Sequence, residues 1–185
     1  MRTLVIGGSG LQGAPTVRQL LAAGHDVSIL SRGTTGEGAG TGGRRPALPE
    51  GVGSVICDRD ADGGALQRAI VEGGFEAVVD YYAMVPQHIE DVVAAYALPS
   101  SALKHYIFVS TNMVYPGGPG GFDISPLRPT VPEELAEVDD AAAHPDDYGG
   151  LKLKCEAALA AVHTSIPRHN FALRQTSERD CGVVT

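Results

Sequence analysis

The chain has 185 residues, a length typical of one globular domain that buries a core of its own. A net charge of −8 with only three lysines argues against nucleic acid or an anionic membrane as partner, because both favour clustered cations. Three scattered cysteines, no signal peptide and no apolar run of about 18 residues predict a cytoplasmic protein without disulfides or a membrane span.

Short apolar runs alternate with stretches of helical spacing along the chain. We expect, in order, a strand at 3–7, helix 14–24, strand 26–31, glycine-rich loop 34–46, strand 52–58, helix 64–73, strand 75–83, helix 86–97, strand 105–111, proline-rich irregular segment 116–134, helix 148–163 and strand 171–174. The strands are continuous apolar runs rather than apolar/polar alternations, which is typical of a parallel sheet covered on both faces. The sequence therefore predicts a doubly wound, three-layer α/β/α Rossmann fold over residues 1–174, followed by an irregular tail at 175–185.

Three glycines spaced three apart join the first strand to the first helix. Gly7 permits a tight turn, Gly10 lets the backbone approach phosphate oxygens, and Gly13 allows close helix packing. The helix that follows would place the positive end of its dipole under a pyrophosphate. We therefore predict a dinucleotide site that includes Leu11 within the loop. The alternative is a plain strand–turn–helix connection that binds no ligand.

Two residues at strand ends bear on the choice of cofactor. The second strand ends in Ser31-Arg32-Gly33, without the carboxylate that normally accepts from the ribose 2′-hydroxyl of NAD. A guanidinium suits a 2′-phosphate, so we favour NADP over NAD. The alternative is that Arg32 is solvated or stacks on the adenine of either cofactor. Asp58, after the third strand, could meet the adenine amino group or could only cap a loop.

Tyr148 and Lys152 form a Tyr-x-x-x-Lys pair on one face of a predicted helix. A nearby ammonium stabilises phenolate and lowers the pKa of a tyrosine, which would let Tyr148 exchange a proton with a substrate hydroxyl or carbonyl. Ser110 and Thr111 follow the fifth strand and could polarise the same oxygen. The alternatives are an exposed tyrosine beside a surface lysine, and hydroxyls that only cap the strand.

These motifs together resemble the extended short-chain dehydrogenase/reductase family, also called the NAD-dependent epimerase/dehydratase family. The residues that match its motifs are Gly7, Gly10, Gly13, Asp58, Ala83, Thr111, Tyr148 and Lys152. The resemblance implies a tightly held NAD(P) bound by these glycines, Leu11, Arg32, Asp58, Ala83, Ser110 and Lys152. It also implies Thr111, Tyr148 and Lys152 as catalytic residues in redox chemistry on a secondary alcohol or ketone, often of a nucleotide sugar. Compared with the family, we expect most of the carboxy-terminal substrate domain to be missing.

Two classes of function remain open from the sequence. One is an NAD(P)-dependent oxidoreductase or epimerase-like enzyme acting on a small molecule; the other is a non-catalytic NAD(P)-binding module or redox sensor. An RNA-associated relative is a weaker third, against which the negative charge argues. Helices near 86–97 and 149–163 are expected to pair in a homodimer, as is common among relatives. No metal site is expected, because the six histidines show no ligand spacing and are interpreted as surface or core residues.

Overall fold

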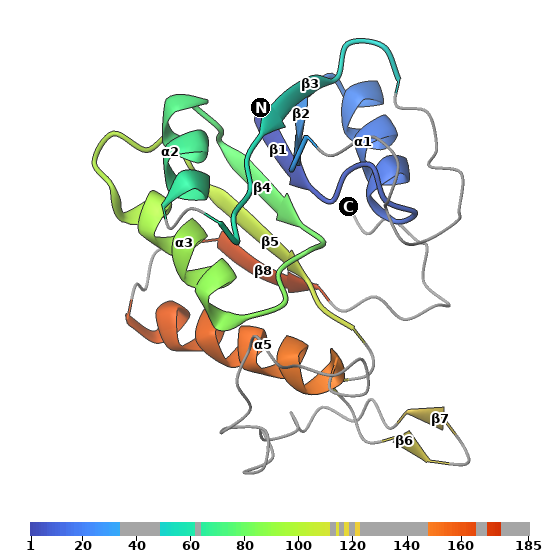
Figure 1. Cartoon of the computed structure of the whole chain (residues 1–185), viewed down its shortest axis with the longest axis vertical. Helices are drawn as coiled ribbons and strands as arrows, with labels where there is room; N and C mark the ends of the chain where they lie inside the picture. Colours follow the sequence, from blue (N-terminus) through green and yellow to red (C-terminus); the bar gives the residue numbers. More distant parts are fainter. Residues whose placement is uncertain are drawn as a thin grey trace.

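The computed structural model describes residues 1–33, 49–61, 64–111, 114, 117–118, 121–122, 148–165 and 170–174 (Figure 1). The predicted loop at 34–46, most of the segment at 116–134 and the tail at 175–185 lie outside the described residues. Within 116–134, Gly117–Gly118 (β6) and Gly121–Phe122 (β7) pair as two short antiparallel strands. We expected irregular structure throughout this segment.

The main sheet has six parallel strands in the order β3-β2-β1-β4-β5-β8. Their bounds are β1 Arg2–Ile6, β2 Asp26–Ser31, β3 Gly53–Ile56, β4 Ala77–Asp80, β5 His105–Val109 and β8 Asn170–Arg174. The order reverses between β1 and β4, which confirms the doubly wound topology. In such a sheet, ligands bind at the carboxyl ends of the strands, beside this reversal.

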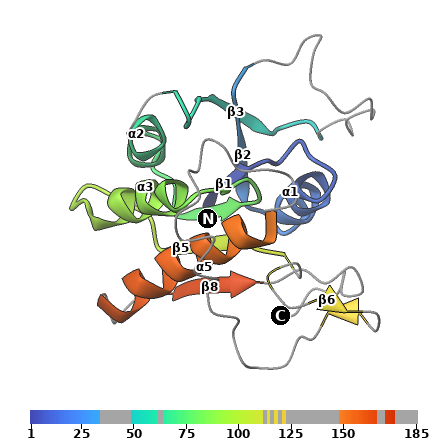
Figure 2. The same ribbon diagram turned by 60° about the horizontal axis from the view of Figure 1, so that its bottom comes forward.

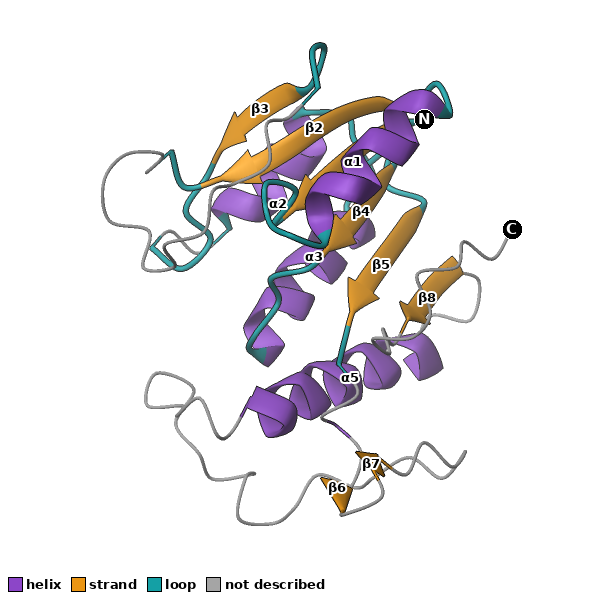
Figure 3. Ribbon diagram, turned by 90° about the vertical axis from the view of Figure 1, so that its right-hand side faces the viewer, coloured by secondary structure: helices purple, strands orange, loops and turns teal. Residues whose placement is uncertain are grey.

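Helices cover the two faces of the sheet unequally (Figures 2 and 3). The helices within the described residues are α1 Gly13–Ala22, α2 Ala65–Glu72, α3 Pro86–Ala97 and α5 Tyr148–Ser165. One core cluster joins α2, α3 and α5 to the sheet around the buried rings of Phe75, Tyr106 and Phe108. A smaller cluster packs Val17 of α1 against Val5 on the other face. Each fully buried apolar side chain of this size stabilises the fold by about 1.5–3 kcal/mol.

The strands β1, β3, β4 and β5 all end earlier than the apolar runs predicted, and a carboxylate lies at or just beyond the end of β3 and of β4. β3 stops at Ile56, after which Oδ1 of Asp58 accepts the amide hydrogen of Asp60 at 3.1 Å. β4 stops at Asp80, whose Oδ1 accepts the amide hydrogen of Tyr82 at 2.9 Å. These local bonds satisfy backbone donors outside the sheet and turn the chain away from it. No helix within the described ranges is long and apolar enough to cross a membrane.

Candidate active site at the carboxyl edge of the sheet

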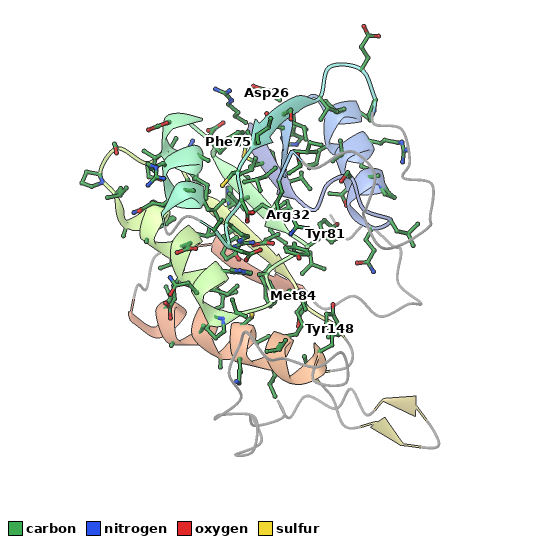
Figure 4. All side chains as sticks on the ribbon, viewed as in Figure 1. Asp26, Arg32, Phe75, Tyr81, Met84 and Tyr148 are labelled. Atoms are coloured by element: carbon green, nitrogen blue, oxygen red, sulfur yellow. The ribbon has the colours of Figure 1, made fainter. Side chains whose placement is uncertain are left out.

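Most of the predicted site residues come from loops and helix starts at one edge of the sheet. In Figure 4, Arg32, Tyr81, Met84 and Tyr148 lie along the edge where the strands end, and Asp26 and Phe75 lie toward the opposite edge. The residues at the first edge follow β2 and β4 or begin α5. The parallel topology therefore gathers at one edge residues that are far apart in sequence.

The glycine turn has the geometry of an anion-binding loop. Gly7 has φ +80°, and its carbonyl accepts the amide hydrogen of Gly10 at 2.9 Å. A Cβ at Gly13 would overlap the backbone of Gly7 and Gly8, so only glycine permits α1 to begin so close to the turn. The first turn of α1 carries no acidic residue and no side-chain cap. The Ala14 amide donates to the Gly10 carbonyl at 3.0 Å and Pro15 has no amide hydrogen, so it is chiefly the positive end of the α1 dipole that can receive a negatively charged group.

A cavity of about 140 Å³ opens beside this turn. Its walls come from the glycine turn, the end of β2, the loop after β3 and the turn after β4, and its lining residues are Ile6, Gly7, Ser9, Leu30, Ser31, Arg32, Cys57, Arg59, Asp60 and Tyr82. A cavity of this volume cannot enclose a whole dinucleotide, so most of such a ligand would extend along the open edge. Tyr82 is 46% exposed here, which places it at the cavity rather than in the core.

The structure brings some predicted cofactor residues into this cavity and leaves others outside it. Arg32 lines it with an exposed side chain. Asp58 is exposed and lines a neighbouring hollow beside α2, where its carboxylate bonds the Asp60 amide. Ala83 is fully buried in the core, and Leu11 is 85% exposed in the glycine turn.

The hydroxyls after β5 are buried. Ser110 is 4% exposed, and its Oγ has no hydrogen-bond partner among the described residues. Thr111 is 9% exposed. A buried hydroxyl without a partner is costly, so Ser110 is available to a ligand that brings a donor or acceptor.

Tyr148 and Lys152 occupy the first two turns of α5, on the same helix face. Lys152 is 1% exposed; its Nζ donates to the carbonyl of Val109 at 3.0 Å and lies 5.9 Å from the centre of the Tyr148 ring. Burial lowers the pKa of Lys152, although Asp80 acts in the opposite direction. Burial also raises the pKa of Tyr148. This direction is the reverse of the expected lowering, because loss of solvent outweighs any help from the ammonium at this distance.

Sequence reasoning missed a buried polar network beneath the cavity. Nη1 of Arg59 donates to Oδ2 of Asp80 at 2.9 Å, with side chains 3% and 0% exposed, and the Tyr106 hydroxyl donates to the same oxygen at 3.3 Å. Burial and the Asp80 charge raise the pKa of Tyr106. The available signal was Asp80 itself, since a carboxylate at the end of an apolar strand needs a buried partner. No group of three or more potential metal ligands occurs among the described residues.

Comparison with known proteins finds a matching family and a curated relative that aligns with almost all of this chain. Residues 3–136 match the NAD dependent epimerase/dehydratase family. A UDP-glucose 4-epimerase of Corynebacterium glutamicum is 29% identical, in an alignment covering 97% of this chain and 50% of that protein. The chain thus spans about half the length of the curated relative that it matches.

Solved structures share the fold at lower identity. The UDP-glucose 4-epimerase of Thermus thermophilus in complex with NAD is similar with a TM-score of 0.60 and 20% identity, covering 94% of this chain and 54% of that one. Gre2 of Candida albicans in complex with NADPH gives a TM-score of 0.63 at 13% identity, covering 95% and 56%. These likenesses support the Rossmann-like arrangement of strands and helices.

Proposed function

Because this chain belongs to the NAD-dependent epimerase/dehydratase family, we propose that it binds NAD(P) along the carboxyl edge of the sheet and performs redox chemistry on a secondary alcohol or ketone. The observation that carries the proposal is the glycine turn and uncapped start of α1 beside a cavity lined by Arg32 and Arg59. Two of the structural neighbours contain UDP-glucuronic acid or UDP-glucose together with NAD. A nucleotide sugar is accordingly the substrate class that we would test first.

The residues present fit a dinucleotide. The glycine turn and the amino-terminal end of α1 would hold the pyrophosphate, and the cavity after β2 and β3 would hold the adenosine half. The unpartnered Oγ of Ser110 and the Lys152 ammonium lie after β5 and on α5, where the nicotinamide half would reach. When bound, the cofactor would accept or donate the hydride.

In this proposal, side chains of the protein transfer the proton to or from the substrate oxygen. Tyr148 would exchange a proton with the substrate oxygen, and Thr111 would hold that oxygen by a hydrogen bond. Lys152 would bind the nicotinamide ribose and favour the phenolate of Tyr148. Because burial alone raises the pKa of Tyr148, the positive charge of the oxidised cofactor would have to supply much of the lowering.

NADP is the cofactor that we favour, because Arg32 lines the cavity where the 2′ position of the adenosine ribose would lie and no carboxylate stands at the end of β2. Arg32→Ala should weaken NADPH binding about tenfold or more and leave NADH binding within about twofold, by the usual strength of a charged hydrogen bond. Calorimetric titration of both cofactors measures this difference. Equal losses for the two would contradict the assignment.

A non-catalytic NAD(P)-binding module is the second candidate, because the Lys152 ammonium bonds the Val109 carbonyl and lies 5.9 Å from the centre of the Tyr148 ring. The two are separated by cofactor reduction with a panel of alcohols and nucleotide sugars, using wild type and Tyr148→Phe. Turnover that disappears in Tyr148→Phe, with NADP affinity retained, supports the enzyme. Binding with no Tyr148-dependent turnover supports the module, and binding of neither NADP nor NAD contradicts both.

We also propose that α3 and α5 form a homodimer contact. The apolar residues expected to form a second face are mostly buried within the chain: Ile89, Val92, Leu151, Leu153 and Leu159 are all at most 7% exposed. What remains partly exposed is Val93, Tyr96 and Val162, so the apolar part of the contact is smaller than the sequence suggested. Sedimentation equilibrium at micromolar concentration tests it, and a monomer would contradict it.

A further inference from the structure

Two separate segments line the cavity, the loop after β3 and the turn after β4. The loop after β3 contributes Arg59 and Asp60, and the turn after β4 contributes Tyr82. The side chain of Asp60 is 46% exposed at the cavity rim, and within its own loop Asp58 bonds the backbone amide of Asp60. The second turn continues into α3 through Met84.

His88, in the first turn of α3, connects these two walls. Its Nε2 lies 2.7 Å from Oδ1 of Asp60, and its Nδ1 accepts the amide hydrogen of Met84 at 3.2 Å. The amide bond assigns the proton to Nε2, which therefore donates to Asp60. The backbone carbonyl of His88 also accepts from Nη2 of Arg59 at 2.7 Å.

The His88 ring connects the Met84 amide to the Asp60 carboxylate, and it lies outside the cavity lining. Its side chain is 8% exposed. Burial and the adjacent Arg59 guanidinium lower its pKa, against the opposing effects of Asp60 and Asp80. The neutral ring thus has one donor and one acceptor, and the structure uses both.

We propose that His88 is a positioning residue for dinucleotide binding: by bonding Asp60 after β3 and the Met84 amide after β4, it fixes the two walls that enclose the adenosine half. The inference rests on the proposed function, because it assigns that half to this cavity. His88 would act only through these loops. The alternative is that the ring merely stabilises the start of α3, which lacks a side-chain cap.

The test measures NADPH affinity of the full chain by titration, together with its melting temperature. Asp60→Ala and His88→Leu should each weaken binding about tenfold, the usual effect of losing a hydrogen bond to a charged group. The double variant should bind about as well as either single variant, because each substitution removes the same hydrogen bond between His88 and Asp60. Asp60→Asn keeps an acceptor for the Nε2 hydrogen and should restore most of the affinity.

Two further comparisons separate positioning from general damage. Asp91→Ala removes an exposed hydrogen bond from Gln87 on the same helix and should leave NADPH affinity unchanged. Adenosine 2′,5′-bisphosphate, which carries only the adenosine half, should lose the same factor in His88→Leu as NADPH does. Nicotinamide mononucleotide, which carries the other half, should not lose affinity.

Several outcomes would overturn the inference. These are unchanged NADPH affinity in a folded His88→Leu protein, multiplying effects in the double variant, or equal losses for both half-ligands. If His88→Leu does not fold, the two Asp60 variants provide the test. The inference is overturned if Asp60→Asn binds NADPH no better than Asp60→Ala. Failure of the wild-type chain to bind any dinucleotide would contradict the proposed function instead.

Discussion

At the amino edge of the sheet, Arg2 pairs with Asp26 at 3.5 Å and Lys104 with Glu76 at 2.6 Å, and these side chains are 30–67% exposed. At the carboxyl edge, the Arg59–Asp80 pair is almost completely buried. Exposed pairs of the first kind contribute little to stability, because water and salt screen them. Taking charged groups out of water is unfavourable, and at the carboxyl edge it is offset by the hydrogen bonds of Arg59 to Asp80 and to the His88 carbonyl. The two edges therefore differ in how much their stability depends on keeping both partners of a charged pair.

The largest expected effect follows from removing the buried charge of Lys152, which lies near the carboxyl edge. Lys152→Met should reduce turnover by about 10²–10⁴-fold, the usual contribution of acid–base catalysis, if the proposed enzyme function is right. The same variant should lower the melting temperature only modestly, because methionine fills a similar volume and removes an unfavourable buried ammonium, while the Val109 carbonyl loses its donor. Steady-state kinetics and calorimetric melting measure the two effects. A marked fall in melting temperature would show that Lys152 is needed chiefly for the fold.

Removing one partner of the buried pair comes next. Asp80→Ala should lower the free energy of unfolding by about 3–5 kcal/mol, because it leaves the Arg59 guanidinium buried without a counter-charge. Urea denaturation measures this loss. Arg59→Met with Asp80→Leu replaces the pair by apolar groups and should recover much of the stability. If the double variant were as unstable as Asp80→Ala, the ionic pair itself would be required.

Acid should affect the two edges in different pH ranges. The pKa of His88 is lowered by burial, so the unfolded chain takes up a proton near its usual value of 6.5 while the folded chain does not. Stability from this group is therefore present above pH 6.5 and declines as the pH falls below it. The pKa of Glu76 is lowered by its hydrogen bond from Lys104, so its contribution is lost only below its usual value of 4.5. Urea midpoints against pH, in wild type and His88→Leu, check this order.

The smallest effect is expected at the amino edge. Glu76→Gln removes an exposed pair and should shift the melting temperature by less than the uncertainty of replicate scans at physiological salt. Lowering the salt concentration should enlarge the shift slightly. A change approaching that of Asp80→Ala would remove the contrast between the edges.

The sequence predicted the parallel sheet well, because continuous apolar runs can be buried on both faces and glycines mark the turns between them. The strand at 26–31 and the helix at 86–97 have the predicted bounds. The expected strands at 52–58 and 75–83 were too long, because side chains of Asp58 and Asp80 bond amides just beyond each strand. Such local competition between side chain and sheet leaves no periodic signal.

The candidate site was only partly predictable. Motif spacing located the glycine turn and the Tyr148–Lys152 pair, because each depends on residues close in sequence. Contacts such as Arg59 with Asp80 or His88 with Asp60 join segments that meet only after the strands pair. His88 fits the expectation of a buried, bonded histidine, but its link to the cavity rim could come only from the three-dimensional arrangement.

Cys57 offers a practical route to an assay that requires no knowledge of the substrate. Cys57 lines the cavity and is 7% exposed, and Cys155 of α5 is fully buried in the core. A nucleotide seated in the cavity would shield the Cys57 sulfur from alkylating reagents. The rate of mass labelling at this one thiol, read with Cys155 as internal reference, would then report occupancy for any compound offered to the protein.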